Sequence, residues 1–190
     1  LRGQGVTAVE LDVLTFNDHA LRSMRRQYPG KRVVTMCEAL SALGLEVGLV
    51  LSPGLPNSTR SSAIDDARQA CAVADFVRIH PTLVLEHSGL RRWHLDQMYN
   101  PLDLGTTIHV CAEMLDIFDR AGTRVIRVGM QPGPDGFGRA VAGPRHTSLR
   151  ELVEAHRTLA HLRDLFEVIP PRSHVIIVCS GPDETRTRGP

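Results

Sequence analysis

Short aliphatic segments alternate with amphipathic helical segments through the first 130 residues of the chain. Each aliphatic segment has the length and the Val, Ile and Leu content of a β-strand. We expect strands at residues 9–15, 46–51, 76–80 and 124–130. Helical periodicity predicts helices at residues 18–27, 32–43, 61–74, 88–98 and 104–120. Strands separated by helices favour parallel pairing, so the sequence predicts an α/β fold.

The expected strands carry two unlike faces, because side chains alternate along a strand. One face is aliphatic throughout. The other gathers Glu10, Asp12, Arg78 and Arg127. An unpaired buried charge costs several kcal/mol, so these groups need a partner, water or a ligand. A barrel, or part of one, fits: outer helices cover the aliphatic faces and the polar faces line a lumen. Two interpretations stay open, a site in the lumen or a structural charge network.

Composition excludes several classes of protein. The chain has 190 residues, 42% of them hydrophobic, and a net charge of +1. No apolar run reaches the ~20 residues of a membrane helix, and the overall charge gives no pull toward nucleic acid or anionic lipid. The 4 cysteines and 9 histidines show no metal-site spacing, which favours buried thiols in a reducing compartment such as the cytoplasm. Leu1 opens the chain without a secretory leader pattern, as in a fragment.

Residues typical of helix ends and loops mark further boundaries in the chain. Gly44 and Gly122 are expected to end helices, and Asn17 or Asp18 to begin one. Residues 131–138 predict an irregular loop, 148–166 a long helix, 175–179 a short strand, and 181–190 a disordered or truncated tail. No Gly-x-Gly-x-x-Gly or phosphate-binding P-loop follows a strand, which argues against an ordinary nucleotide-binding domain.

Five motifs in register over about residues 5–155 resemble the radical SAM superfamily, in its Elp3-like branch. Residues 5–18, GVTAVELDVLTFND, resemble the family's fourth-strand segment, and residues 51–59, LSPGLPNST, resemble its fifth-strand turn. Residues 78–85, RIHPTLVL, residues 125–132, VIRVGMQP, and residues 142–146, AGPRH, are similar to later segments of that branch.

The resemblance implies a partial (β/α)6 TIM-like barrel made of its last three or so βα units, with a carboxyl-terminal α/β extension. It places half of the barrel at residues 1–130 and the start of a further domain at 131–180. It also implies a [4Fe-4S] cluster that cleaves S-adenosylmethionine, after which a 5′-deoxyadenosyl radical abstracts hydrogen from a substrate. The branch includes enzymes that modify RNA, so tRNA is one candidate substrate.

The chain departs from the family pattern at three points. The three-cysteine cluster loop is absent, so the cluster would be bound by a missing amino-terminal part and this chain alone is expected to be inactive. Leu14 replaces a glutamine that faces the cofactor ribose, and Val50 replaces a common polar residue. Neither side chain can donate or accept a hydrogen bond, and Asp12 could compensate.

The matched positions supply candidate site residues. For the cofactor we expect Glu10, Asp12, the turn Gly54, Leu55 and Pro56, and the side chains of Arg78 and His80. Arg78 is a fixed cation suited to the methionine carboxylate of the cofactor, and Glu10 could bond to the cofactor or pair with Arg78. Arg127 and Gln131 are the candidate substrate contacts, and no catalytic or metal-ligating residue is assigned.

Two functions follow from the resemblance. One is a fragment of a radical SAM enzyme. The alternative is a non-catalytic remnant barrel that acts as a binding or scaffold protein. A half barrel has open strand edges, so the isolated chain is expected to self-associate.

Overall fold

Four parallel strands form the main sheet of the computed structural model, which describes residues 4–130 and 139–178. The order across the sheet is β1 (Ala8–Leu14), β2 (Glu46–Leu51), β3 (Phe76–Ile79) and β5 (Arg124–Val128), and each neighbouring pair is parallel. All four carboxyl ends therefore lie at one edge of the sheet. The α/β architecture expected from the alternating pattern is confirmed.

Helices pack on the aliphatic face of this sheet. The elements are α2 (Gly30–Ala42), α3 (Arg60–Cys71), α5 (Leu104–Ala121) and α6 (Leu149–Glu167). Together with the strands they enclose one core, whose fully buried side chains include Leu49, Val77, Met114 and Phe118. The opposite face keeps the charged side chains and remains partly exposed, as the expected lumen face should.

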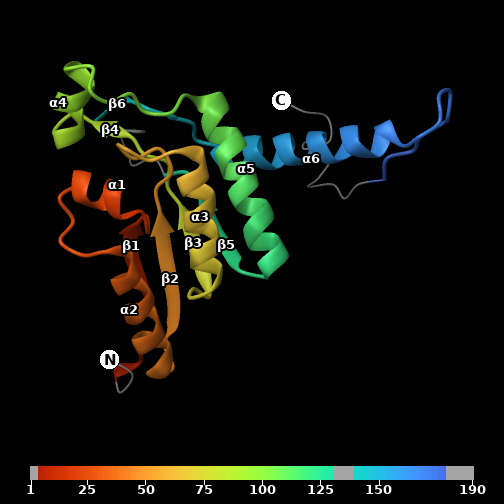
Figure 1. Cartoon of the computed structure of the whole chain (residues 1–190). Helices are drawn as coiled ribbons and strands as arrows, with labels where there is room; N and C mark the ends of the chain where they lie inside the picture. Colours follow the sequence, from red (N-terminus) through yellow and green to blue (C-terminus); the bar gives the residue numbers. More distant parts are fainter. Residues whose placement is uncertain (1–3, 131–138, 179–190) are drawn as a thin grey trace.

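Smaller elements gather at the carboxyl edge of the sheet (Figure 1). They are α1 (Asp18–Ser23), α4 (Gly89–Leu95) and a two-stranded antiparallel ribbon of β4 (Val84–Leu85) and β6 (Ala140–Ala142). The ribbon was not predicted, because strands of this length carry no alternation signal. No described helix is long and apolar enough to cross a membrane.

Side-chain and glycine signals fix most helix ends. The Asn17 side chain accepts hydrogen bonds from the amides of His19 and Ala20, which confirms it as the N-cap of α1. Gly44 and Gly122 have φ of 69° and 73°, the left-handed region that favours glycine. They follow α2 and α5 as expected.

Three expectations were wrong. Helix α1 ends at Ser23, not near residue 27, because Arg25 takes φ of 55° and the Arg26 amide bonds back to the Leu21 carbonyl. This is a helix-ending turn usually made by glycine. Residues 175–178 form no strand. Strand alternation predicts Ile126 on the aliphatic face with Val128 and places Val125 on the other face, but a bulge in β5 turns Ile126 outward, 43% exposed, while Val125 packs against the core.

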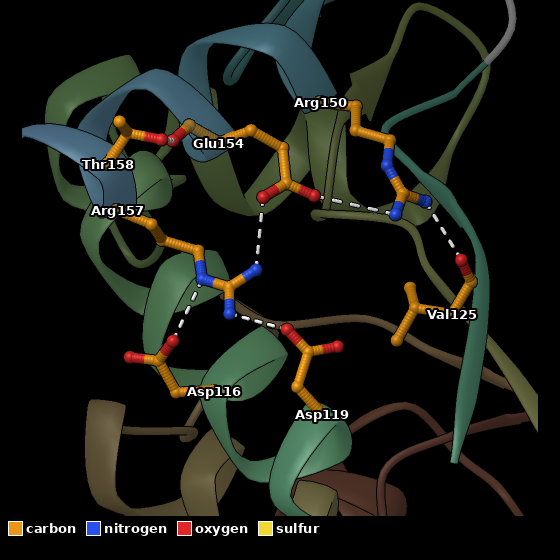
Figure 2. A network of polar contacts seen from close by, with 7 residues as sticks. All are labelled: Asp116, Asp119, Val125, Arg150, Glu154, Arg157 and Thr158. Atoms are coloured by element: carbon orange, nitrogen blue, oxygen red, sulfur yellow. Dashed lines mark hydrogen bonds and ion pairs between the residues drawn. The ribbon is translucent and has the colours of Figure 1, made fainter. Parts of the chain in front are cut away.

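An arginine network docks α6 on the body of the molecule (Figure 2). The Arg157 guanidinium contacts Asp116 at 2.8 Å and Asp119 at 2.5 Å on α5, and Glu154 at 3.0 Å on its own helix. Arg150 donates to the Val125 carbonyl of β5 at 2.8 Å. These contacts hold the long helix against both α5 and the edge strand.

Candidate functional site

A charge pair spans the lumen face of the sheet. The Arg78 Nε donates to the Glu10 Oε2 at 2.8 Å, and each side chain is about 30% exposed. Glu10 lies on β1 and Arg78 on β3, so the pair reaches over the intervening β2. Between them β2 presents Gly48, which has no side chain, opposite Glu10 and the short side chain of Val50 opposite Arg78. Of the two roles that the sequence left open for Glu10, pairing with Arg78 is realised.

Arg127 lies beside this pair. It is the register partner of Arg78 on β5, so two guanidinium groups sit on neighbouring strands of one face. Among residues 4–130 and 139–178, Arg127 forms no ion pair. Glu10 therefore pairs with one of two neighbouring guanidinium groups, and Arg127 keeps no ion-pair partner among the described residues.

His80 completes the group at the carboxyl end of β3. Its Nε2 is buried and has no hydrogen-bond partner within the described part of the chain. Burial lowers the pKa of His80 below 6.5, and the charges of Arg78 and Arg127 lower it further against the opposing effect of Glu10 and Asp12. The neutral imidazole so favoured keeps a donor or an acceptor at Nε2 for a ligand.

An aromatic ring closes the amino end of the lumen face. Phe76 is 8% exposed, and a Cβ added at Gly48 would overlap its ring. The guanidinium of Arg124 lies over the same ring at 5.8 Å from its centroid and also pairs with Glu46. Space for a ligand is thus confined to the carboxyl half of this face.

Asp12 stands apart from the central pair. Its Oδ2 lies 3.6 Å from Arg26, in the segment after α1. Of the charge network considered from sequence, only the Glu10–Arg78 contact is present, while Asp12 turns to an arginine that the sequence did not single out. At 66% exposure the Asp12 side chain remains open to solvent.

The turn at Gly54, Leu55 and Pro56 is held from within the protein. The Thr82 hydroxyl and amide donate to the Pro53 carbonyl at 3.1 and 3.0 Å, and the Tyr99 hydroxyl donates to the Gly54 carbonyl at 2.6 Å. Burial raises the pKa of Tyr99 to about 12. Gly54 has φ of 87°, and the Leu102 side chain leaves no space for a Cβ there. The expected site turn is therefore rigid.

A buried carboxylate ties α3 to the end of β1. The Asp66 Oδ2 accepts from the Thr15 hydroxyl and its Oδ1 from the Phe16 amide, both at 2.7 Å. Burial raises the pKa of Asp66 to about 6, against the two hydrogen bonds, which lower it. The segment that leads out of β1 is fixed by this contact.

Sequence reasoning missed Thr82, Tyr99 and Asp66. Asp66 did carry a signal, because it occupies the buried stripe of α3 together with Ala63, Ala67 and Ala70. A carboxylate on such a stripe needs a buried partner. Tyr99 and Thr82 follow no spacing rule. Gln131, a candidate substrate contact, lies outside the described residues.

The described cysteines do not form a metal centre. Cys37, Cys71 and Cys111 are free and lie on α2, α3 and α5. In the described part of the chain no three His, Cys, Asp or Glu side chains are placed to hold a metal ion. The residues described here therefore do not fit an iron–sulfur cluster.

Comparisons with known proteins agree with the fold and the motifs. A family model described as "Radical_SAM C-terminal domain" matches residues 74–161. The chain is 30% identical over 117 residues to a tRNA uridine(34) acetyltransferase of Dehalococcoides mccartyi (strain CBDB1), a match that covers 58% of this chain and 25% of the relative.

A solved structure has the same fold. It is the archaeal Methanocaldococcus infernus Elp3 with an N-terminal deletion, at a TM-score of 0.74 and 24% identity, covering 85% of this chain and 38% of that one. The likeness confirms the expected partial barrel with its carboxyl-terminal extension. The chain spans about a quarter of the curated relative's length. Over these stretches the chain is similar to the Elp3-like branch of the radical SAM superfamily, and it matches part of the length of such a protein.

Proposed function

We propose that this chain forms the carboxyl-terminal half of a radical SAM barrel and binds S-adenosylmethionine on its lumen face. The proposal rests on Arg78, His80 and Arg127, which lie in or directly after the carboxyl halves of β3 and β5, and on Glu10, which reaches Arg78 from the middle of β1. In barrels with parallel strands, ligands bind at this end. Arg127, which has no ion-pair partner among the described residues, and the buried His80 nitrogen without a partner are features that a polar, anionic ligand group would satisfy.

The candidate site residues take different proposed roles according to their place on the sheet. Arg78, with Glu10 fixing its orientation, offers the carboxylate of the cofactor a cation, and His80 offers Nε2 beside it. Gly54, Leu55 and Pro56 offer a rigid backbone, and Asp12 an exposed carboxylate. Arg127 and Gln131 are proposed to face the substrate.

S-adenosylmethionine, cleaved at a reduced [4Fe-4S] cluster, would supply a 5′-deoxyadenosyl radical. Because the described cysteines do not fit a cluster, we assign its ligands to a segment outside this chain. For the substrate we propose RNA, tRNA among it, on the basis of the relative described as a tRNA uridine(34) acetyltransferase.

A titration followed by nuclear magnetic resonance tests the cofactor proposal. With millimolar S-adenosylmethionine, we expect shifts in the His80 imidazole and the Gly54 amide of the wild-type chain. We expect at least tenfold weaker binding in Arg78→Met, because one fixed charge partner is lost. Arg120→Met is the matched control, since Arg120 is exposed near the end of α5. Shifts absent from His80 and Gly54, or equal affinities in the two variants, would overturn the assignment.

One observation favours a second function. Val50 lies on the lumen face between Asp12 and Arg78, and Leu14 follows the bulge of β1 with φ of 70°. Both are apolar where the resemblance implies polar groups, as a remnant barrel without cofactor would be. In that case S-adenosylmethionine leaves the spectrum unchanged, and the Glu10–Arg78 pair is a structural contact only.

A further inference from the structure

A groove beside the proposed site brings together residues far apart in sequence. It lies between α1 and α4, which sit close to each other beyond the carboxyl edge of the sheet (Figure 1). Its volume is about 680 Å³. Met24 and Arg25 line one wall, and Arg92 and Trp93 line the other, with Met98 at the rim, 71% exposed.

The groove is rich in arginine. Arg25 and Arg92 face it from opposite walls, and Arg22 and Arg91 are exposed on the same two helical segments. The acidic groups nearby are Asp96, 3.7 Å from the Arg92 Nε, and Asp18, which accepts from the Gly30 amide. Within the part of the chain described, neither Arg22 nor Arg25 forms an ion pair. The groove therefore has positive charge left over for a polyanion.

Trp93 supplies a stacking surface at a fixed position. The side chain is half-buried, and the Trp93 carbonyl accepts from the Met98 and Tyr99 amides at 2.8 and 3.2 Å. Tyr99 is the residue whose hydroxyl holds the Gly54 carbonyl. The backbone that carries the indole is thus linked, through a short turn, to the same turn that borders the proposed site.

We propose that this groove binds a single-stranded RNA segment, with a base stacked on Trp93 and the backbone phosphates between Arg25 and Arg92. Aromatic stacking combined with flanking cations is how proteins hold single strands, and it needs no particular base sequence. An acidic peptide would use the arginines but would leave the indole without a stacking partner. The inference rests on the proposed RNA substrate and adds to it a place where the strand enters.

The single tryptophan of the chain makes the test specific. We would titrate the whole chain with an eight-nucleotide uridine-rich RNA and follow the fluorescence of Trp93. Stacking is expected to quench the emission. Binding of the same RNA, labelled and followed by anisotropy, is expected to weaken about tenfold in Trp93→Leu, in line with ~1–3 kcal/mol per stacked base.

The arginines are tested by salt dependence. In Arg25→Met/Arg92→Met, the slope of log K against log salt should fall in magnitude by ~1.4, since each phosphate contact on a single strand contributes ~0.7. The matched control is Arg163→Met/Arg172→Met, two exposed arginines in the carboxyl-terminal part of the chain. Its slope and its affinity should equal those of the wild type.

Three results would overturn the proposal that RNA binds in this groove. Equal quenching by a polyglutamate peptide would show a site for acidic polypeptides. RNA binding that leaves Trp93 emission and the Trp93→Leu affinity unchanged would place the RNA elsewhere, and the proposed function would stand. No RNA binding at all, with S-adenosylmethionine still shifting His80, would remove the RNA substrate and keep the cofactor site.

Discussion

The Glu10 carboxylate and the Arg78 guanidinium meet at 2.8 Å although a third strand lies between the strands that carry them. Gly48 leaves the intervening β2 without a side chain opposite Glu10, and the Phe76 ring lies where a Cβ of residue 48 would stand. Arg127, the register partner of Arg78, is left without a carboxylate among the described residues. His80 lies in the field of all three charges.

The titration of His80 should report these charges directly. The pKa of His80 is expected below 6.5 in the wild type, because burial and the two arginines disfavour the imidazolium. Arg127→Met should raise it and Glu10→Gln should lower it further. The imidazole resonances followed between pH 4 and 8 give both values. A shift of the same sign in both variants would contradict the charge arrangement.

The stability of the fold should carry a pH dependence from Asp66. Its pKa is about 6 in the folded chain and near 3.8 when unfolded. The unfolded state therefore ionises first, and the Asp66 contribution makes the fold less stable as pH rises from about 4 to 6. This difference between the folded and unfolded pKa of Asp66 corresponds to ~3 kcal/mol of unfolding free energy.

Asp66→Asn isolates this contribution, because the amide oxygen still accepts from Phe16 and nothing titrates. The difference in unfolding free energy between wild type and variant, measured with urea from pH 4 to 7, should change in favour of the variant as pH rises. A difference that stays constant over this range would show that Asp66 is already ionised at pH 4 and that its pKa is not raised.

Gly48→Ala should destabilise the chain by about 1–3 kcal/mol. The added Cβ would overlap the Phe76 ring, over which the Arg124 guanidinium also lies. Phe76→Leu in the Gly48→Ala background should recover part of the loss. Gly89→Ala is the control, since a Cβ at Gly89 meets nothing within 4 Å. Equal unfolding midpoints for Gly48→Ala and Gly89→Ala would refute the ring contact.

Arg157→Met should loosen α6. Three carboxylates lose their shared cation, and since Asp119 is 58% exposed we expect a loss of about 2 kcal/mol rather than the full cost of a buried pair. Urea unfolding measures the loss, with Arg163→Met as the exposed control on the same helix. If the two variants unfold alike, the network in Figure 2 does not hold the helix.

Much of this structure could be predicted from the sequence, for physical reasons that differ by element. Aliphatic runs and glycine or asparagine caps placed the four parallel strands and most helix ends. The end of α1 could not be predicted, because Arg25 takes a backbone conformation for which glycine is the usual signal. The β5 bulge could not be predicted either, because it exchanges the faces of Val125 and Ile126 and leaves the apolar content of the strand the same.

The candidate site was predicted only in part. Charges on the lumen face were visible from strand alternation, and the Glu10–Arg78 contact was one of two options for Glu10. Which carboxylate meets which arginine depends on strand order and register, and these are set by tertiary packing. Thr82 contacts the turn across 29 positions of sequence and Tyr99 across 45, and no local sequence pattern reveals contacts of this range.

The most direct test of the central claim is iron analysis of the product of the full reading frame that contains this chain, purified without oxygen. We expect a three-cysteine loop upstream of Leu1, ~4 irons per chain, and 5′-deoxyadenosine released from S-adenosylmethionine on reduction. A reading frame that begins at this chain, or a full product that binds no iron and leaves S-adenosylmethionine intact, would contradict a radical SAM enzyme and leave a remnant barrel.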